Sequence, residues 1–337
     1  MKKAYEVFVR PLLFALDPET AHQFTIAGLS AASNVGFALR TLNFFRPRTQ
    51  PKRVFGLNFP NPIGLAAGLD KNGVALPAWN ALGFGFIEIG TVTAKAQSGN
   101  PKPRIFRFSE QRALINRLGF NNDGADIIAR RLKKLQDSGR WPEVPLGINI
   151  GKSMATPLTE AIGDYLYSFR VLREFADYIV LNVSSPNTPG LRELQSPGAL
   201  SELLSAIRAT NLITPKPIVV KIAPDLTTEE LEQIVSICES NGVAAIIATN
   251  TTLDHWSIPT GRDEQGGLSG GPLREKSTTL VRRIAARSTI PVIASGGIMD
   301  GDSAREKIEA GAQLVQIYTG LIYRGPGLLR EIGTALA

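Results

Sequence analysis

Short apolar runs separated by amphipathic stretches dominate the chain after about residue 54. Eight of these runs are predicted to be strands, over 63–66, 86–90, 146–150, 178–183, 218–222, 245–249, 292–295 and 314–318. Helices are predicted between them, including those over 124–135, 200–211, 228–239 and 274–287. Buried parallel strands read as continuous apolar runs, and their alternation with helices is typical of the α/β class. Eight such units predict a (β/α)8 TIM barrel.

A doubly wound open sheet is the competing fold. It usually carries fewer strands and a GxGxxG turn after the first strand, and no such turn occurs in this sequence. Two further segments, 54–59 and 105–108, are predicted to be small hairpin strands outside the eight. The barrel is therefore the expected fold.

The first 50 residues show a different, helical pattern. Apolar residues from Tyr5 to Leu16 recur on one helical face, with Pro11 expected to bend that helix or end a short first turn. Asp17 as N-cap and Pro18 at the first helical position predict a second helix that runs towards Ser33. Asn34 and Gly36 can end it, and a basic, proline-rich connector follows over 46–52. We therefore expect an N-terminal two-helix extension over residues 1–50 and a barrel domain over 51–337.

Composition and charge exclude several classes of protein. The 337 residues are 43% hydrophobic and 20% charged, which are ordinary globular proportions. The net charge is +7, and most of it lies in the first 53 residues, so the near-neutral remainder argues against a nucleic-acid-binding face. A single cysteine, Cys238, and two histidines argue against a disulfide framework or a metal site and favour an intracellular protein.

The N-terminal stretch is not predicted to be a signal peptide or a membrane span. Glu6 and Arg10 interrupt the place where an apolar signal core should be, and no small-residue cleavage site follows. No run of 18 apolar residues occurs in the sequence. The apolar face of the first helix must nevertheless be covered, either by packing on the barrel or by insertion into a membrane interface.

Polar residues follow the predicted strands, where barrel enzymes place their active sites. Two lysines and many amides and hydroxyls converge there: Lys71, Thr91, Asn149, Asn182, Ser184, Ser185, Asn187, Lys221, Thr249, Asn250, Thr251 and Thr319. No carboxylate pair and no Ser-His-Asp set is present among them, so glycosidase and acyl-transfer chemistry are poorly supported. The set suits a large, polar, anionic ligand.

Two glycine-rich loops indicate a phosphate group. The segments 294–304 and 318–327 follow the seventh and eighth strands, the usual position for phosphate in a barrel. Turns also require glycine, so each loop alone is weak evidence. Together they favour a phosphate-bearing cofactor.

Longer motifs identify a family. The sequence contains GLAAGLDKNG at 64–73, EIGTVT at 88–93, KPRIFRF at 102–108, INRLGFNN at 115–122, LNVSSPNTPGLR at 181–192, VKIAPDL at 220–226, ATNTT at 248–252, GGLSGGPL at 266–273 and LVQIYTG at 314–320. These motifs closely resemble the dihydroorotate dehydrogenases, and the resemblance covers the chain from Tyr5 onward. It implies a flavin mononucleotide (FMN) barrel, one FMN per chain, that oxidises dihydroorotate to orotate in pyrimidine biosynthesis.

Two features resemble the quinone-linked class of that family. The soluble class has a cysteine as the base beside the flavin, whereas this sequence has Ser185 there, and Cys238 lies in a helical stretch. The quinone-linked class also carries an N-terminal helical pair. The resemblance thus implies a dihydroorotate:quinone oxidoreductase that contacts the cytoplasmic side of the cell membrane peripherally through these helices, with a membrane quinone as electron acceptor. We expect a monomer.

The resemblance also implies roles for individual residues. Ser185 is the catalytic base. Substrate contacts are expected from Lys71, Asn116, Arg117, Leu118, Gly119, Phe120, Asn187, Asn250 and Thr251. Flavin contacts are expected from Ala67, Lys71, Thr91, Asn149, Asn182, Lys221, Thr249, Gly270, Gly297, Tyr318 and Thr319. A quinone tunnel is expected along His22, Arg107 and Tyr318.

Two other readings remain open at the level of the sequence. A phosphosugar isomerase or aldolase barrel would use the same loop glycines and a strand-end lysine, but it also needs a carboxylate base at another strand end. A catalytically silent adaptor at the membrane surface would bind no flavin. Lys221 argues for an anionic ligand, because a lysine is costly to bury without an anionic partner.

Overall fold

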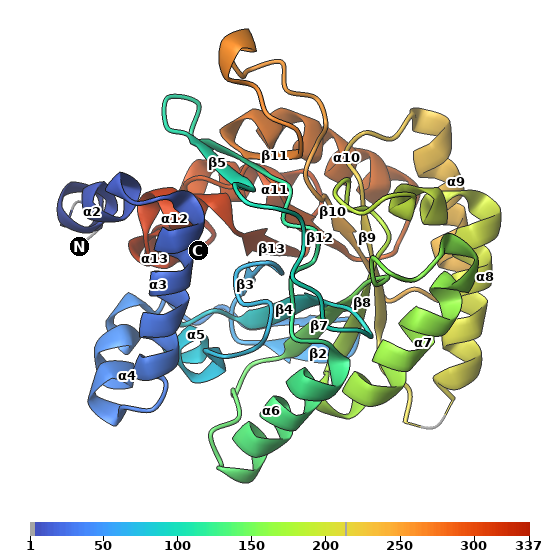
Figure 1. Cartoon of the computed structure of the whole chain (residues 1–337), viewed down its shortest axis with the longest axis horizontal. Coiled ribbons are helices and arrows are strands. Elements are labelled where there is room, and N and C mark those ends of the chain that lie inside the picture. Colours follow the sequence, from blue (N-terminus) through green and yellow to red (C-terminus); the bar gives the residue numbers. More distant parts are fainter. Residues whose placement is uncertain (1–3, 213) are drawn as a thin grey trace.

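Eight parallel strands form a closed barrel in the computed structural model, which describes residues 4–212 and 214–337 (Figure 1). The strands are β3 (Ile63–Leu65), β4 (Phe86–Val92), β7 (Leu146–Ile150), β8 (Tyr178–Asn182), β9 (Ile218–Ile222), β10 (Ala245–Ala248), β12 (Val292–Ser295) and β13 (Leu314–Ile317). Each pairs with the next along the chain, and β13 pairs with β3 to close the ring. The predicted TIM barrel is confirmed.

Helices surround the barrel and bury their apolar faces against it (Figure 1). They are α5 (Leu76–Leu82), α6 (Ala125–Asp137), α7 (Ala161–Leu172), α8 (Pro197–Thr210), α9 (Thr228–Ser240), α10 (Arg274–Arg287), α11 (Gly301–Glu309), α12 (Thr319–Arg324) and α13 (Gly327–Ala335). Short 3-10 turns cover Leu158–Glu160, Arg173–Phe175, Leu191–Gln195, Thr260–Arg262 and Gly271–Leu273. Local sequence sets several helix starts; at α9, for example, Thr227 and Glu230 form a reciprocal capping box.

A hairpin closes the amino-terminal end of the barrel. Strands β1 (Lys52–Val54) and β2 (Leu57–Phe59) pair antiparallel, as the pattern over 54–59 predicted. The Phe59 ring packs edge to face on Phe86 with centroids 5.4 Å apart, and Phe55 packs likewise on Tyr178 at 5.8 Å. These rings fill the end of the barrel that lies opposite the carboxyl ends of the strands.

A small antiparallel sheet stands at that opposite rim. It consists of β5 (Ile105–Phe108), β6 (Ala113–Asn116) and β11 (Gly267–Gly270), in the order β11-β6-β5. The strand over 105–108 was predicted, but β6 and β11 were not. The segment that forms β11, GLSG, has no apolar alternation, so its pairing with β6 about 150 residues away depends on the tertiary structure.

The N-terminal segment has one more helix than expected. A π-helical turn (Tyr5–Val9) leads into α2 (Arg10–Ala15), and α3 (Pro18–Ala32) follows, with the Asp17 carboxylate accepting the N–H groups of Glu19 and Thr20 as predicted. The chain then forms α4 (Gly36–Leu42) and a 3-10 turn (Asn43–Phe45). Gly36, expected to end the second helix, begins a third instead, because Ser33 already closes α3.

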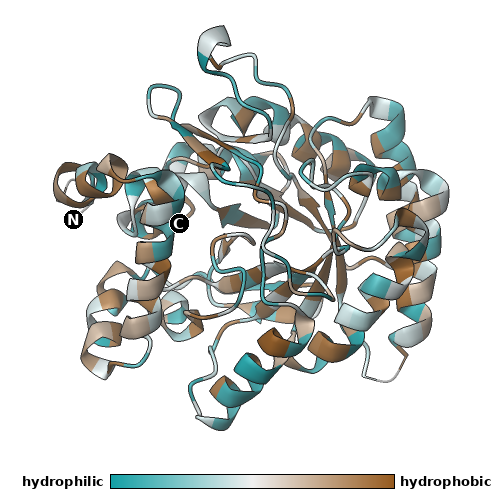
Figure 2. Ribbon diagram, in the orientation of Figure 1, coloured by the Kyte–Doolittle hydropathy of each residue, from teal (hydrophilic) through white to brown (hydrophobic). Residues whose placement is uncertain are grey.

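The outer face of this segment is rich in exposed apolar side chains, visible as brown helices around the N-terminus in Figure 2. Phe8, Leu12, Phe24, Phe37 and Phe44 are each more than 60% exposed. Among the described residues, the helices are too short or too polar to cross a membrane. The apolar face of the first helix is thus only partly covered by the barrel.

We expect Phe59→Ala to destabilise the protein by about 3–5 kcal/mol, because it empties the aromatic plug at the bottom of the barrel. The measurement is the urea unfolding midpoint, with Phe37→Ala as control, since Phe37 is 81% exposed. A loss below about 1 kcal/mol for Phe59→Ala would contradict the plug's importance.

Candidate active site

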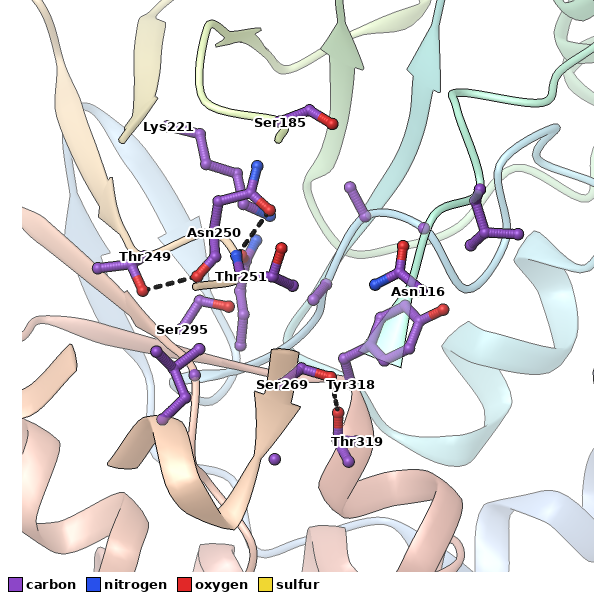
Figure 3. Close-up of a pocket in the computed structure, with 18 of the residues that line it drawn as sticks. Asn116, Ser185, Lys221, Thr249, Asn250, Thr251, Ser269, Ser295, Tyr318 and Thr319 are labelled. Atoms are coloured by element: carbon purple, nitrogen blue, oxygen red, sulfur yellow. Dashed lines mark hydrogen bonds between the residues drawn. The ribbon is translucent and has the colours of Figure 1, made fainter. Parts of the chain in front are cut away.

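A polar cavity opens at the carboxyl ends of the barrel strands, with about 960 Å³ of space between protein atoms when its open mouth is included (Figure 3). Most of the residues predicted for the site line it. They are Ala67, Lys71, Thr91, Asn116, Leu118, Gly119, Phe120, Asn182, Ser185, Asn187, Lys221, Thr249, Asn250, Thr251, Gly270, Gly297, Tyr318 and Thr319.

Two of the residues predicted to contact substrate or flavin do not line this cavity. The Arg117 side chain points away from the cavity to pair with Glu264 at 2.9 Å and to cover the Phe106 ring. Asn149 is buried beneath the cavity floor instead of lining it. Any contact of Asn149 with a ligand would therefore pass through its neighbours.

Hydrogen bonds connect the amides of the floor. Thr91 Oγ1 donates to Asn149 Oδ1 at 2.6 Å and accepts from Asn182 Nδ2 at 2.8 Å. Asn182 Oδ1 in turn accepts from Asn250 Nδ2 at 3.3 Å. Because each amide is held by the next, these groups face the cavity in defined orientations.

Lys221 and Glu88 are two titratable groups buried inside the barrel. Glu88 is fully buried on β4, and its two oxygens accept from Asn149 and Gln316. Burial raises the pKa of Glu88, and the nearby Lys221 ammonium opposes that rise. Burial lowers the pKa of Lys221, opposed by Glu88. Lys221 thus has a carboxyl group as a neighbour within the protein, a partner that the sequence analysis sought only in a ligand.

Ser185 lies on the loop after β8, at the rim of the cavity (Figure 3). Its Oγ accepts the backbone N–H of Asn187 at 3.3 Å. The Asn187 side chain donates to the carbonyl of Asn116 at 3.0 Å, which joins this loop to β6. The described side chains place no histidine or carboxylate in hydrogen-bond contact with the hydroxyl.

Free backbone donors gather on the opposite side of the cavity. The N–H groups of Gly296, Gly297 and Gly320 donate to no acceptor among the described residues. Thr319 Oγ1 and Ser269 Oγ lie 2.9 Å apart beside them. Gly297 has a φ of +71°, and a side chain there would meet the Arg274 backbone at 2.1 Å. This arrangement fits a phosphate group.

Lys71 is the second cation at the cavity. Burial lowers its pKa to about 8, with the Arg104 guanidinium adding to the effect. Its Nζ donates to the Gly68 carbonyl at 3.0 Å. The neighbouring Asp70 turns away and accepts from two backbone N–H groups and the Trp79 indole, so it is a structural residue.

A second, mostly apolar cavity of about 2010 Å³, open solvent included, lies between the N-terminal helices and the barrel. Tyr318 lines both cavities, and His22 and Arg107 are polar groups in the apolar one. Burial, with the Lys71 ammonium adding to it, lowers the pKa of His22 to about 3, so the ring is neutral at pH 7. Arg107 donates to the carbonyls of Leu13 and Leu16.

Comparison with known proteins identifies the family. A model described as dihydroorotate dehydrogenase matches residues 51–337. The chain belongs to the dihydroorotate dehydrogenase family. It is 49% identical over 352 residues to the dihydroorotate dehydrogenase (quinone) of Chloroflexus aurantiacus, covering 98% of this chain and 96% of the relative. The same enzyme of Gloeobacter violaceus is also 49% identical, over 97% and 92%.

A solved structure agrees with the sequence comparison. The DHODH of Eimeria tenella in complex with ferulenol superposes with a TM-score of 0.86 at 37% identity, over 95% of this chain and 90% of that one. The match includes most of the N-terminal segment, since it extends beyond the residues of the family model.

Several residues of this dihydroorotate dehydrogenase family member were missed by sequence reasoning. Ser269, Ser295 and Gln316 also line the cavity, and Gln316 Oε1 is buried without a partner. Glu88 supports the floor from below. An acid inside the apolar run FIEIG, and a glutamine inside LVQIY, were the available signals, because polar residues in a doubly buried strand need a specific partner.

Proposed function

We propose that this protein oxidises dihydroorotate to orotate with bound FMN and passes the electrons to a membrane quinone, as a step of pyrimidine biosynthesis. One observation carries the proposal most strongly. A polar cavity and an apolar cavity share a single wall residue, Tyr318. A polar substrate can therefore reach one side of a bound redox group through the polar cavity, and a lipophilic quinone can reach the other side through the apolar cavity.

The residues present fit FMN. The N–H groups of Gly296, Gly297 and Gly320 would hold the phosphate, as free amide donors do at such loops. Lys221 and the unpaired Gln316 Oε1 would meet the polar edge of the ring. When bound, the flavin accepts a hydride and releases two electrons.

Ser185 would remove a proton from the substrate carbon beside the departing hydride. A serine hydroxyl is a weak base, so the proton must pass onward to water or to another group. Asn116, Asn187, Asn250 and Thr251 would grip the substrate ring, because a wrong ring would leave these amides unpaired. Lys71 would pair with the substrate carboxylate.

Residues 1–50 would form the quinone entrance and rest on the membrane. The apolar cavity lies under this segment, and its outer face carries exposed phenylalanines and leucines. Such a face inserts into the interface, and nearby basic residues add attraction to anionic lipid. We propose a peripheral monomer on the cytoplasmic side of the membrane, with the barrel domain over 51–337.

The rival phosphosugar isomerase or aldolase reading has little support from this site. It requires a free carboxylate base at the cavity, whereas Glu88 and Asp70 are buried and already engaged by hydrogen-bond donors. The alternative of a catalytically silent adaptor predicts that no flavin binds.

An anaerobic absorbance spectrum tests the proposal directly. We expect a flavin band that bleaches when dihydroorotate is added and returns when a soluble quinone follows. A band that stays oxidised with dihydroorotate would overturn the proposed substrate. A protein that takes up no FMN on reconstitution would overturn the flavin chemistry altogether.

Ser185→Ala should slow flavin reduction by dihydroorotate by about 10²–10⁴-fold, the usual contribution of a positioned acid–base group. Flavin content should be unchanged, because Ser185 lies across the cavity from Ser295 and Thr319, which adjoin the glycine loops (Figure 3). Stopped-flow absorbance measures the rate. Reduction at the wild-type rate would remove Ser185 from the mechanism.

Dihydroorotate binding should weaken as pH rises above about 8. The pKa of Lys71 is about 8, and only its protonated form pairs with the substrate carboxylate. Above that pH the dissociation constant should rise by up to tenfold per pH unit. Because dihydroorotate itself reduces the flavin, the dissociation constant is measured with the product orotate, which carries the same carboxylate, by titration of the oxidised flavin spectrum from pH 6 to 10. Lys71→Met should bind orotate weakly with no break near pH 8. A break retained in Lys71→Met would assign it to another group.

A further inference from the structure

Glu19 of α3 and Arg104, which precedes β5, form a buried ion pair that the proposed chemistry does not use. Arg104 Nη2 lies 2.7 Å from Glu19 Oε1, and Arg104 Nε donates to both carboxylate oxygens at 3.2 and 3.1 Å. Both side chains are only 7% exposed. Removal of one partner of such a pair leaves an uncompensated buried charge.

The other edge of Arg104 holds the loop before it. Its Nη1 donates to the carbonyl of Ser98 at 2.6 Å and to that of Asn100 at 2.9 Å. The loop is tightly packed there, since a side chain at Gly99 would meet Arg104 Nη1 at 2.7 Å. The guanidinium group thus joins Glu19 on one edge to residues 98–100 on the other.

That loop in turn contacts the expected substrate residues. The Asn100 side chain donates to the carbonyls of Arg117 at 2.9 Å and Asn187 at 3.4 Å, and its backbone N–H donates to that of Leu118 at 3.1 Å. Asn187 N–H reaches Ser185 Oγ. A continuous set of hydrogen bonds thus leads from a helix of the N-terminal segment to the substrate side of the polar cavity.

We propose that Glu19 is a positioning residue for dihydroorotate: by holding Arg104 it fixes the 98–100 loop and, through it, the segments that grip the substrate. This inference rests on the proposed function. It makes the substrate site dependent on α3, although α3 borders the apolar cavity. The Glu19 side chain itself makes no hydrogen bond to a residue expected to bind substrate. The two cavities are then coupled through the protein as well as through the flavin.

A second ion pair of the N-terminal segment provides a matched control. Glu6 pairs with Arg324 of α12 at 2.7 Å. Arg324 also contacts the Met299 carbonyl and Glu331, and none of these groups binds the 98–100 loop. Glu6→Gln therefore weakens the attachment of the segment without disturbing the path to the substrate.

The test uses the full-length, flavin-loaded protein and two readouts, the orotate dissociation constant by calorimetry and the rate of flavin reduction by dihydroorotate. Glu19→Gln should weaken orotate binding at least tenfold and raise the dihydroorotate KM more than it lowers kcat, with flavin content unchanged. Glu6→Gln should bind orotate within twofold of the wild type. Orotate binding by Glu19→Gln within twofold of the wild type would overturn the inference.

A double-mutant cycle checks the route. Arg104→Gln combined with Glu19→Gln should weaken binding little more than Arg104→Gln alone. The other cation that pairs with Glu19, Lys102 at 3.5 Å, is 60% exposed, so its loss should contribute little. Additive losses would overturn the route and indicate that Glu19 acts directly on Lys71.

If Glu19→Gln does not fold, Glu19→Asp keeps the charge but shortens the reach of the carboxylate. It should still weaken orotate binding at least threefold, and unchanged binding would contradict the inference. A wild type that dihydroorotate does not bleach would mean that the proposed function itself fails.

Discussion

Closure of the eight-stranded barrel is the constraint on which the rest of this molecule depends. Parallel strands leave unpaired backbone groups at two edges of an open sheet, and the pairing of β13 with β3 removes both edges. The same closure brings the carboxyl ends of all eight strands to one rim. Lys71, Asn182, Lys221 and Thr319, far apart in the sequence, become neighbours around one cavity for that reason.

Charge inside the barrel follows from this geometry. A ring of short, doubly buried strands has little room for water, so each buried polar group needs a partner within the protein. Glu88 receives two amide donors and stands near Lys221, while Gln316 Oε1 remains unpaired. The Glu88 carboxyl group thus has its partners within the protein, whereas Gln316, which lines the cavity, keeps an acceptor without a partner.

The N-terminal segment extends the site in two ways. It covers one flank of the barrel and encloses an apolar cavity. Its Glu19 also pairs with Arg104, whose guanidinium group holds the loop over residues 98–100 beside the polar cavity. An ion pair at the surface would contribute little, but a buried, bidentate one holds a defined geometry. Helix α3 and the loop over residues 98–100 are therefore connected through a few hydrogen bonds.

The sequence by itself determined the order of the eight barrel strands and their alternation with helices. Apolar runs set the eight strands to within two residues at each end, and local chemistry such as Asp17 before Pro18 set helix starts, because both signals lie within a few neighbouring residues. The motifs also placed most cavity residues, since they follow the strands directly. The tertiary structure alone decided the partners: β11 with β6, Glu88 near Lys221, Arg117 turned outward, and Glu19 on Arg104. These contacts join residues up to about 150 positions apart, and no local pattern encodes which distant group will satisfy a buried charge or a strand edge.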